Sequence, residues 1–109
     1  MPPRPLGQFE HLLLYAIQHL QRGEEGASGP SIRRLIEEHT GRVVSPGAAF
    51  TALDRLEQRG LLRSELGDPT PERGGKRKRL YEIRPSGAAA LRAADASLQR
   101  MSKLARSTD

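Results

Sequence analysis

The chain has 109 residues, a length that is typical of one domain and disfavours a two-domain enzyme with a cleft between its halves. Eighteen Lys and Arg against 13 Asp and Glu give a formal charge of +5, which is typical of proteins that bind polyanions. The absence of cysteine excludes disulfides, thiolate metal sites and thiol chemistry. No apolar run approaches the roughly 18 residues of a membrane span and no signal peptide is recognisable, so we expect a cytoplasmic protein.

Amphipathic periodicity predicts two helices in the first 40 residues. Residues 1–5 carry three prolines and an arginine, so we expect them to form a flexible arm. Apolar residues at spacings of three and four predict a helix from Phe9 that ends near Gly23. A second helix is predicted from Pro30, which suits a first helical turn, to the residue before Gly41.

Ser45 and Pro46 predict the start of a third helix, because a hydroxyl can cap free amide groups and proline already has the helical φ angle. Gly60 is expected to end this helix. Its periodicity predicts an inward face made of Ala49, Phe50, Leu53 and Leu56. The opposite face carries mostly small or polar side chains, namely Gly47, Ala48, Thr51, Asp54, Arg55 and Gln58.

The last part of the chain predicts a hairpin and a long helix. Two strands are expected over residues 61–66 and 80–83, joined by a long loop that contains proline and glycine. A helix should follow from about Pro85 to beyond Leu104. Its apolar residues alternate at spacings of three and four and have little core of their own chain left to cover, which indicates a dimer seam. The seam residues are Leu91, Ala94, Leu98, Met101 and Ala105.

The order of these elements indicates the fold class. Three helices, a hairpin and a long helix are the order of a mainly helical winged helix-turn-helix with an appended helix. We therefore expect a flexible arm over residues 1–5, a DNA-binding domain over residues 6–84, and a C-terminal dimerisation helix and tail over residues 85–109.

The hairpin carries a cluster of cations. A basic run is often only a solvated surface. Here it follows a capped helix with a small outer face, as the wing beside a recognition helix does. We therefore expect five residues to neutralise DNA phosphates: Arg73, Lys76, Arg77, Lys78 and Arg79.

The third helix provides the candidates for base contact. Gly47 and Ala48 leave its leading surface without bulk, and with Ser45 they are expected to orient the helix against phosphate. Thr51 and Arg55 lie one turn apart on this surface and are expected to contact base edges. The alternative for Arg55 is that it pairs only with a neighbouring acid or with a phosphate.

The sequence shows no catalytic or metal-binding pattern. His11, His19 and His39 have no carboxylate or nucleophile at a matching spacing. Gly75 and Lys76 lack the earlier glycine and the following hydroxyl of a phosphate-binding loop. We therefore expect no metal, no organic cofactor and no enzyme activity.

Several segments resemble regulators of the PadR-like family. Residues 6–14 resemble the opening of these proteins, residues 32–41 their second helix, and residues 51–60 their recognition helix and its exit. The resemblance covers roughly residues 6–91. It is most specific in the wing, at Gly67, Pro69, Thr70, Pro71, Glu72, Arg73, Gly74, Gly75, Arg79 and Tyr81.

The resemblance implies a bacterial transcriptional regulator, commonly a repressor, that dimerises through its last helix and releases DNA on a signal. Phe50 replaces a tyrosine whose hydroxyl can reach a phosphate, so we expect Phe50 to act mainly as core. Arg84 replaces a helix-capping threonine, and Ser86 is the candidate cap in its place. No aromatic residue follows Tyr81, so we do not expect a planar drug pocket, and no inducer can be identified from these residues.

The sequence thus predicts a double-stranded DNA-binding regulator, a repressor that acts as a homodimer on a palindromic operator. The alternative is a winged helix that binds RNA or another protein without operator specificity, because the same fold hosts other tasks. Competition between duplex DNA and RNA would separate these two functions.

Overall fold

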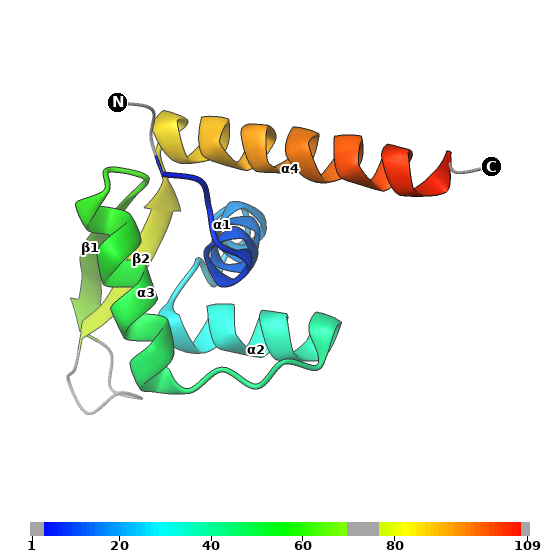
Figure 1. Cartoon of the computed structure of the whole chain (residues 1–109). Helices are drawn as coiled ribbons and strands as arrows, with labels where there is room; N and C mark the ends of the chain where they lie inside the picture. Colours follow the sequence, from blue (N-terminus) through cyan, green and yellow to red (C-terminus); the bar gives the residue numbers. More distant parts are fainter. Residues whose placement is uncertain (1–3, 70–76, 108–109) are drawn as a thin grey trace.

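The computed structural model describes residues 4–69 and 77–107 (Figure 1). The chain order of the elements is the predicted one, and both strands are longer than predicted. Arg73 and Lys76 lie outside the described residues. The helices and strands are α1 (Gln8–Leu20), α2 (Gly29–Thr40), α3 (Pro46–Gln58), β1 (Leu62–Pro69), β2 (Arg77–Ile83) and α4 (Pro85–Arg106).

Local side-chain chemistry fixes the ends of α3. Ser45 is its N-cap residue, and the Ser45 hydroxyl accepts a hydrogen bond from the Ala48 amide at 3.1 Å. Pro46 occupies the first turn, as predicted. Gly60 follows the helix with a φ angle of +78°, a left-handed conformation that favours glycine. The predicted start and end of this helix are therefore confirmed.

The start of α4 is where it was predicted, but its cap is not. The helix begins at Pro85, directly after the N-cap residue Arg84. The Ser86 hydroxyl donates to the Gly60 carbonyl at 2.6 Å instead of capping α4. The predicted capping role of Ser86 is wrong, because its side chain instead joins α4 to the residue that follows the end of α3.

Helix α1 is the centre of the fold. It lies between α2 and α4 in Figure 1, and it also contacts α3 and β2. Its residues Leu13, Leu14 and Ile17 are fully buried, together with Ile32 of α2 and Leu53 of α3. These side chains form one apolar core, and burial of such surface is the main force that holds the elements together.

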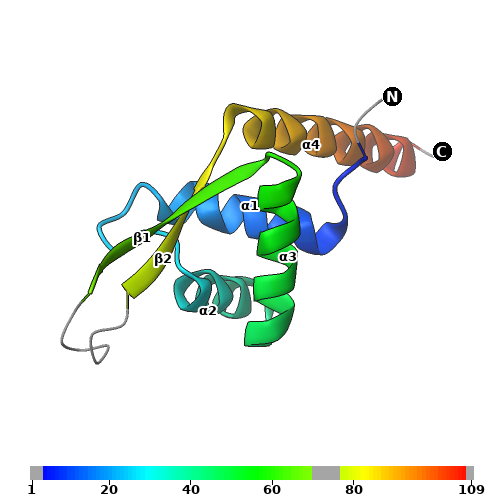
Figure 2. The ribbon, with the colours of Figure 1, turned by 90° about the vertical axis from the view of Figure 1, so that its left-hand side faces the viewer.

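The hairpin is antiparallel and is anchored at its base. Leu62 pairs with Ile83, and the register is regular as far as Leu66 opposite Arg79. The Tyr81 amide donates to the Ala27 carbonyl at 2.8 Å, which links β2 to the segment before α2. From this base the hairpin extends away from the helices beside α3 (Figure 2). The fold is a mainly helical winged helix with an appended helix, as the sequence predicted.

Helix α4 begins in tight contact with the core. A Cβ atom on Gly87 would lie 2.3 Å from the Leu61 carbonyl oxygen and 2.8 Å from Ile83 Cγ1. One turn further on, Leu91 is 3% exposed and belongs to the core of its own chain. The expectation that Leu91 is left for a partner subunit is therefore wrong.

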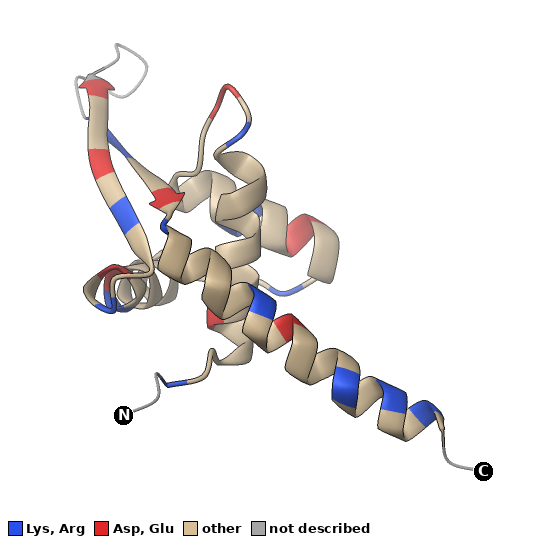
Figure 3. Ribbon diagram, turned by 90° about the horizontal axis from the view of Figure 1, so that it is seen from above, with Lys and Arg blue, Asp and Glu red and all other residues tan. Residues whose placement is uncertain are grey.

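A polar cluster joins α1 to the middle of α4. The Tyr15 hydroxyl donates to the Asp95 carboxylate, and His11 Nε2 lies 3.1 Å from Asp95 Oδ1. The rings of His11 and Tyr15 stack with their centroids 5.0 Å apart. Beyond Asp95 the helix continues away from the rest of the chain (Figure 3). Among the described residues, no helix combines the length and apolar character needed to cross a bilayer.

The close approach at Gly87 predicts the effect of a single methyl group. Gly87→Ala is expected to lower the free energy of unfolding by about 1–3 kcal/mol, because the new Cβ atom meets backbone that cannot rotate away. Gly47→Ala is the matched control, since a Cβ atom there meets no described atom within 4 Å. The control should be neutral or stabilising by up to about 1 kcal/mol. Equal stability of Gly87→Ala and wild type in urea denaturation would contradict this packing.

The cluster at Asp95 predicts a pH dependence. The hydrogen bond to Asp95, then burial and the charge of Asp95, raise the pKa of Tyr15 from 10.0 to about 12. A phenol with a raised folded-state pKa contributes stability that is complete below pH 10 and is lost as the pH rises towards 12.

Wild type is therefore expected to be more stable than Tyr15→Phe below pH 10, by an amount that solvent exposure of the pair keeps small. The difference should shrink between pH 10 and pH 12. Denaturant titrations of both proteins at several pH values measure it. A difference that stays constant over this range would refute the assignment.

Candidate nucleic-acid interface

The outer face of α3 is open to solvent. Gly47, Ala48, Thr51 and Arg55 are all exposed, as is the N-cap residue Ser45. The outward orientation predicted for Gly47, Ala48, Thr51 and Arg55 agrees with their exposure. Small side chains at the start of the helix leave its backbone accessible to a partner surface.

The Arg55 side chain is exposed and makes no side-chain contact that would occupy it among the described residues. Within the described part of the molecule, no hydrogen bond or ion pair engages its guanidinium group. The adjacent acid Asp54 accepts a hydrogen bond from Gln58 Nε2 at 2.9 Å. The alternative in which Arg55 is paired with a neighbouring acid is therefore not the observed arrangement.

Phe50 does not belong to the core. It is 64% exposed, whereas Ala49, Leu53 and Leu56 are at most 2% exposed and fill the inner face of α3. Phe50 follows Ala49 and is turned about 100° further around the helix, toward the edge that faces the wing. The expectation that Phe50 acts mainly as core is wrong, because no element covers this edge among the described residues.

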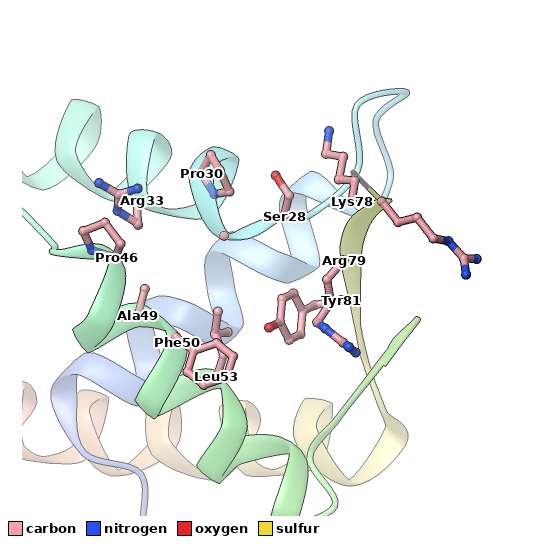
Figure 4. A pocket seen from close by; sticks show the side chains of 12 residues that line it. Ser28, Pro30, Arg33, Pro46, Ala49, Phe50, Leu53, Lys78, Arg79 and Tyr81 are labelled. Carbon is pink, nitrogen blue, oxygen red and sulfur yellow. The ribbon is translucent and has the colours of Figure 1, made fainter. Parts of the chain in front are cut away.

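Those predicted phosphate-binding cations that the structure describes lie on β2. Arg77 donates to the backbone carbonyls of Gly67 at 2.9 Å and Leu66 at 3.3 Å. Lys78 donates to the Glu25 carbonyl at 3.3 Å. Successive strand residues point to opposite sides, and Lys78 and Arg79 accordingly leave β2 in different directions in Figure 4.

A hydrogen-bonded chain joins the wing to α3. The Arg79 guanidinium donates to Ser64 Oγ at 2.9 Å. The Ser64 hydroxyl donates to the Glu57 carboxylate at 2.8 Å. Because Ser64 is on β1 and Glu57 is on α3, these contacts fix how the wing stands beside the helix.

Two cavities lie between α3 and β2. The first, of about 410 Å³, is also bordered by the start of α2, and the second, of about 420 Å³, lies toward the end of α3. Phe50, Arg79 and Tyr81 line both cavities. Figure 4 shows the Tyr81 side chain between β2 and α3. Burial raises the pKa of the Tyr81 phenol, although Arg79 beside it lowers the pKa in part, so the side chain is neutral at pH 7.

The described residues contain no group of three or more acidic or histidine side chains that could hold a metal ion. The surface between α3 and β2 instead combines the open face of the helix with the cations Arg77, Lys78 and Arg79, and Asp54 and Glu57 line its second cavity. Sequence reasoning missed Phe50 as part of this surface. Its position next to Ala49, at the edge of the apolar stripe, was the available signal.

The predicted seam on α4 divides into two parts. Ala94 is partly buried, whereas Leu98, Met101 and Ala105 are exposed. Leu104, which the seam prediction omitted, is 62% exposed and lies beside them. The outer half of α4 thus presents an apolar face that the described part of the chain does not cover.

These features define a class of protein. A helix-turn-helix core with an open third helix, and a basic hairpin fixed beside it, is the architecture of winged-helix domains. A family model described as the transcriptional regulator PadR-like family matches residues 17–93. The match covers more than half of the chain, and the chain belongs to this family, as its resemblance implied.

Solved structures confirm the fold. A PadR-like transcription factor from Bacteroides fragilis matches with a TM-score of 0.76 and 21% identity, covering 92% of this chain and 88% of its own. A PadR-like transcriptional regulator from Bacillus cereus gives a TM-score of 0.71, 21% identity and coverages of 90% and 87%. Bacillus subtilis PadR in complex with operator DNA gives a TM-score of 0.63 and 18% identity, and the match covers 78% of this chain and 45% of that one. None of the curated proteins compared matches the chain.

Proposed function

We propose that this regulator binds double-stranded DNA sequence-specifically as a homodimer and represses transcription from a palindromic operator in the bacterial cytoplasm. The observation that carries the proposal is the open outer face of α3 beside the cations of β2. The likeness of the fold to Bacillus subtilis PadR, which was solved with operator DNA, supports it.

In this proposal α3 enters the major groove. Thr51 and Arg55 contact base edges, and the unengaged guanidinium of Arg55 suits a bidentate contact with guanine. Ser45, Gly47 and Ala48 bring the start of the helix against a phosphate. The wing cations Arg73, Lys76, Arg77, Lys78 and Arg79 neutralise the backbone.

The dimer is proposed to form through the exposed face of α4. Leu98 and Met101 are 60% and 64% exposed. Met101 follows Leu98 by three residues and Ala105 follows Met101 by four, the alternation of a coiled-coil seam. A two-fold axis through this face would present two copies of α3 to half-sites about one helical turn of DNA apart. This symmetry is the basis for a palindromic operator.

Binding of RNA or of a protein by the same winged helix is the alternative function. The open face of α3 favours DNA, because an α-helix fits the major groove of B-DNA, whereas the corresponding groove of A-form RNA is deep and narrow. Selection of bound fragments from random duplex DNA tests the proposal. A palindromic consensus is expected, and RNA of the same sequence should not compete.

The seam on α4 predicts the effect of one buried charge. Wild type is expected to sediment as a dimer at micromolar concentration, and Leu98→Glu as a monomer, because a carboxylate would lose its hydration in the apolar interface. Gln99→Glu is the matched control, since it adds the same charge to an adjacent exposed position off the seam. Analytical ultracentrifugation measures all three proteins. A monomeric wild type would refute the seam.

The division of labour between wing and helix predicts two different phenotypes. Arg77→Ala with Lys78→Ala should weaken binding to all duplexes alike and reduce the slope of log K against log salt by up to about two, since each phosphate contact releases counterions. Arg55→Ala should instead cost about 1–3 kcal/mol on the selected site and relax one base position. Fluorescence anisotropy over a range of salt concentrations measures both effects.

Arg92→Ala with Arg100→Ala is the control for the wing variant. It removes the same charge from the exposed surface of α4 and should leave the salt slope unchanged. Equal weakening of selected and random DNA by Arg55→Ala, with a change of about one in the salt slope, would show that Arg55 is a phosphate contact.

A further inference from the structure

Phe50 is a large apolar side chain that the helical core leaves uncovered. It is 64% exposed and borders both cavities between α3 and β2. Single exposed apolar residues are common on protein surfaces. Phe50, however, lies on the edge of α3 that borders β2, and both elements are assigned to DNA binding. Its ring has no group that donates or accepts a conventional hydrogen bond, so an uncharged partner that gains from contact with it is an apolar one.

The charges on the side of Phe50 toward the end of α3 argue against a phosphate as that partner. The second cavity is lined by Asp54 and Glu57 as well as by Phe50 and Arg79. Asp54 is exposed, and its charge is met only by the neutral amide of Gln58. On this side of the ring a phosphate would lie near two carboxylates, whereas an uncharged base edge would not be repelled by them. The cations Arg33, Arg77 and Lys78 line only the first cavity, so a phosphate suits that side of Phe50 and a base edge suits the side toward Asp54.

The major groove offers one apolar group, the C5-methyl group of thymine. We infer that Phe50 is a specificity-determining residue that contacts the methyl group of one thymine in each half-site. The inference rests on the proposed function, because it requires α3 to lie in the major groove. It adds a base preference next to the positions assigned to Thr51 and Arg55.

Replacement of thymine by deoxyuridine tests this contact, because deoxyuridine lacks only the methyl group. Starting from a duplex selected by wild type, each thymine is replaced in turn, symmetrically in both half-sites. At one position wild type is expected to lose about fourfold in affinity for each half-site, the factor expected for one buried methyl group. Phe50→Ala should bind the selected duplex more weakly and lose nothing further at that position.

Thr51→Ser is the matched control within the same helix. Thr51 carries another exposed methyl group that could contact thymine, and serine keeps the hydroxyl while removing that methyl. The deoxyuridine effect should persist in Thr51→Ser. Because Phe50 is exposed, Phe50→Ala is expected to fold, and a thermal melt close to that of wild type checks this.

The inference is overturned if Phe50→Ala keeps the deoxyuridine effect, if Thr51→Ser abolishes it, or if no thymine replacement weakens wild-type binding. It is also overturned if Phe50→Ala weakens selected and random duplexes equally, since the ring would then contact sugar. In all these cases the protein still selects a duplex and the proposed function stands. A wild-type protein that selects no duplex overturns both.

Discussion

The anchoring of the hairpin base on the helical core is the constraint on which the rest of the structure depends. Tyr81 is 5% exposed, and its amide is bonded to Ala27 just before α2. Two residues later Ile83 leads into α4, whose Gly87 lies against Leu61, directly before β1 at the same end of the hairpin. One small buried region thus sets both the angle of the wing to α3 and the direction in which α4 leaves the domain.

The sequence predicted well what depends on local chemistry. The hydroxyl of Ser45, the ring of Pro46 and the left-handed Gly60 act within one turn, and they placed α3 correctly. The sequence predicted less well the burial of residues whose neighbours are distant in the chain. Periodicity assigned Phe50 and Leu91 to faces of their helices. It could not show that the wing leaves Phe50 uncovered or that the body of the domain covers Leu91, and these contacts decide burial.

The three described cations of β2 keep their positive charge although each is hydrogen-bonded. Arg77 and Lys78 donate to backbone carbonyls and Arg79 donates to a hydroxyl, so their immediate acceptors are neutral. By contrast, Arg63 is paired with Glu82 at 2.9 Å and Arg59 with Glu10 at 3.3 Å. Ion pairs of this kind cancel charge locally. The hydrogen bonds on β2 instead hold cations in place while their field still reaches a polyanion.

Helix α4 carries two roles along one continuous stripe. Leu91 belongs to the core of its own chain, and Leu98, two turns later, is exposed for the proposed partner. Asp95 lies between them and is held by Tyr15 and His11 of the central helix α1. Because one rigid helix joins the domain to the seam, the angle fixed at Asp95 sets the separation of the two α3 helices in the proposed dimer. Loosening that cluster would therefore alter the preferred spacing of half-sites while leaving the contacts within each half-site intact, since α3 and β2 do not depend on it.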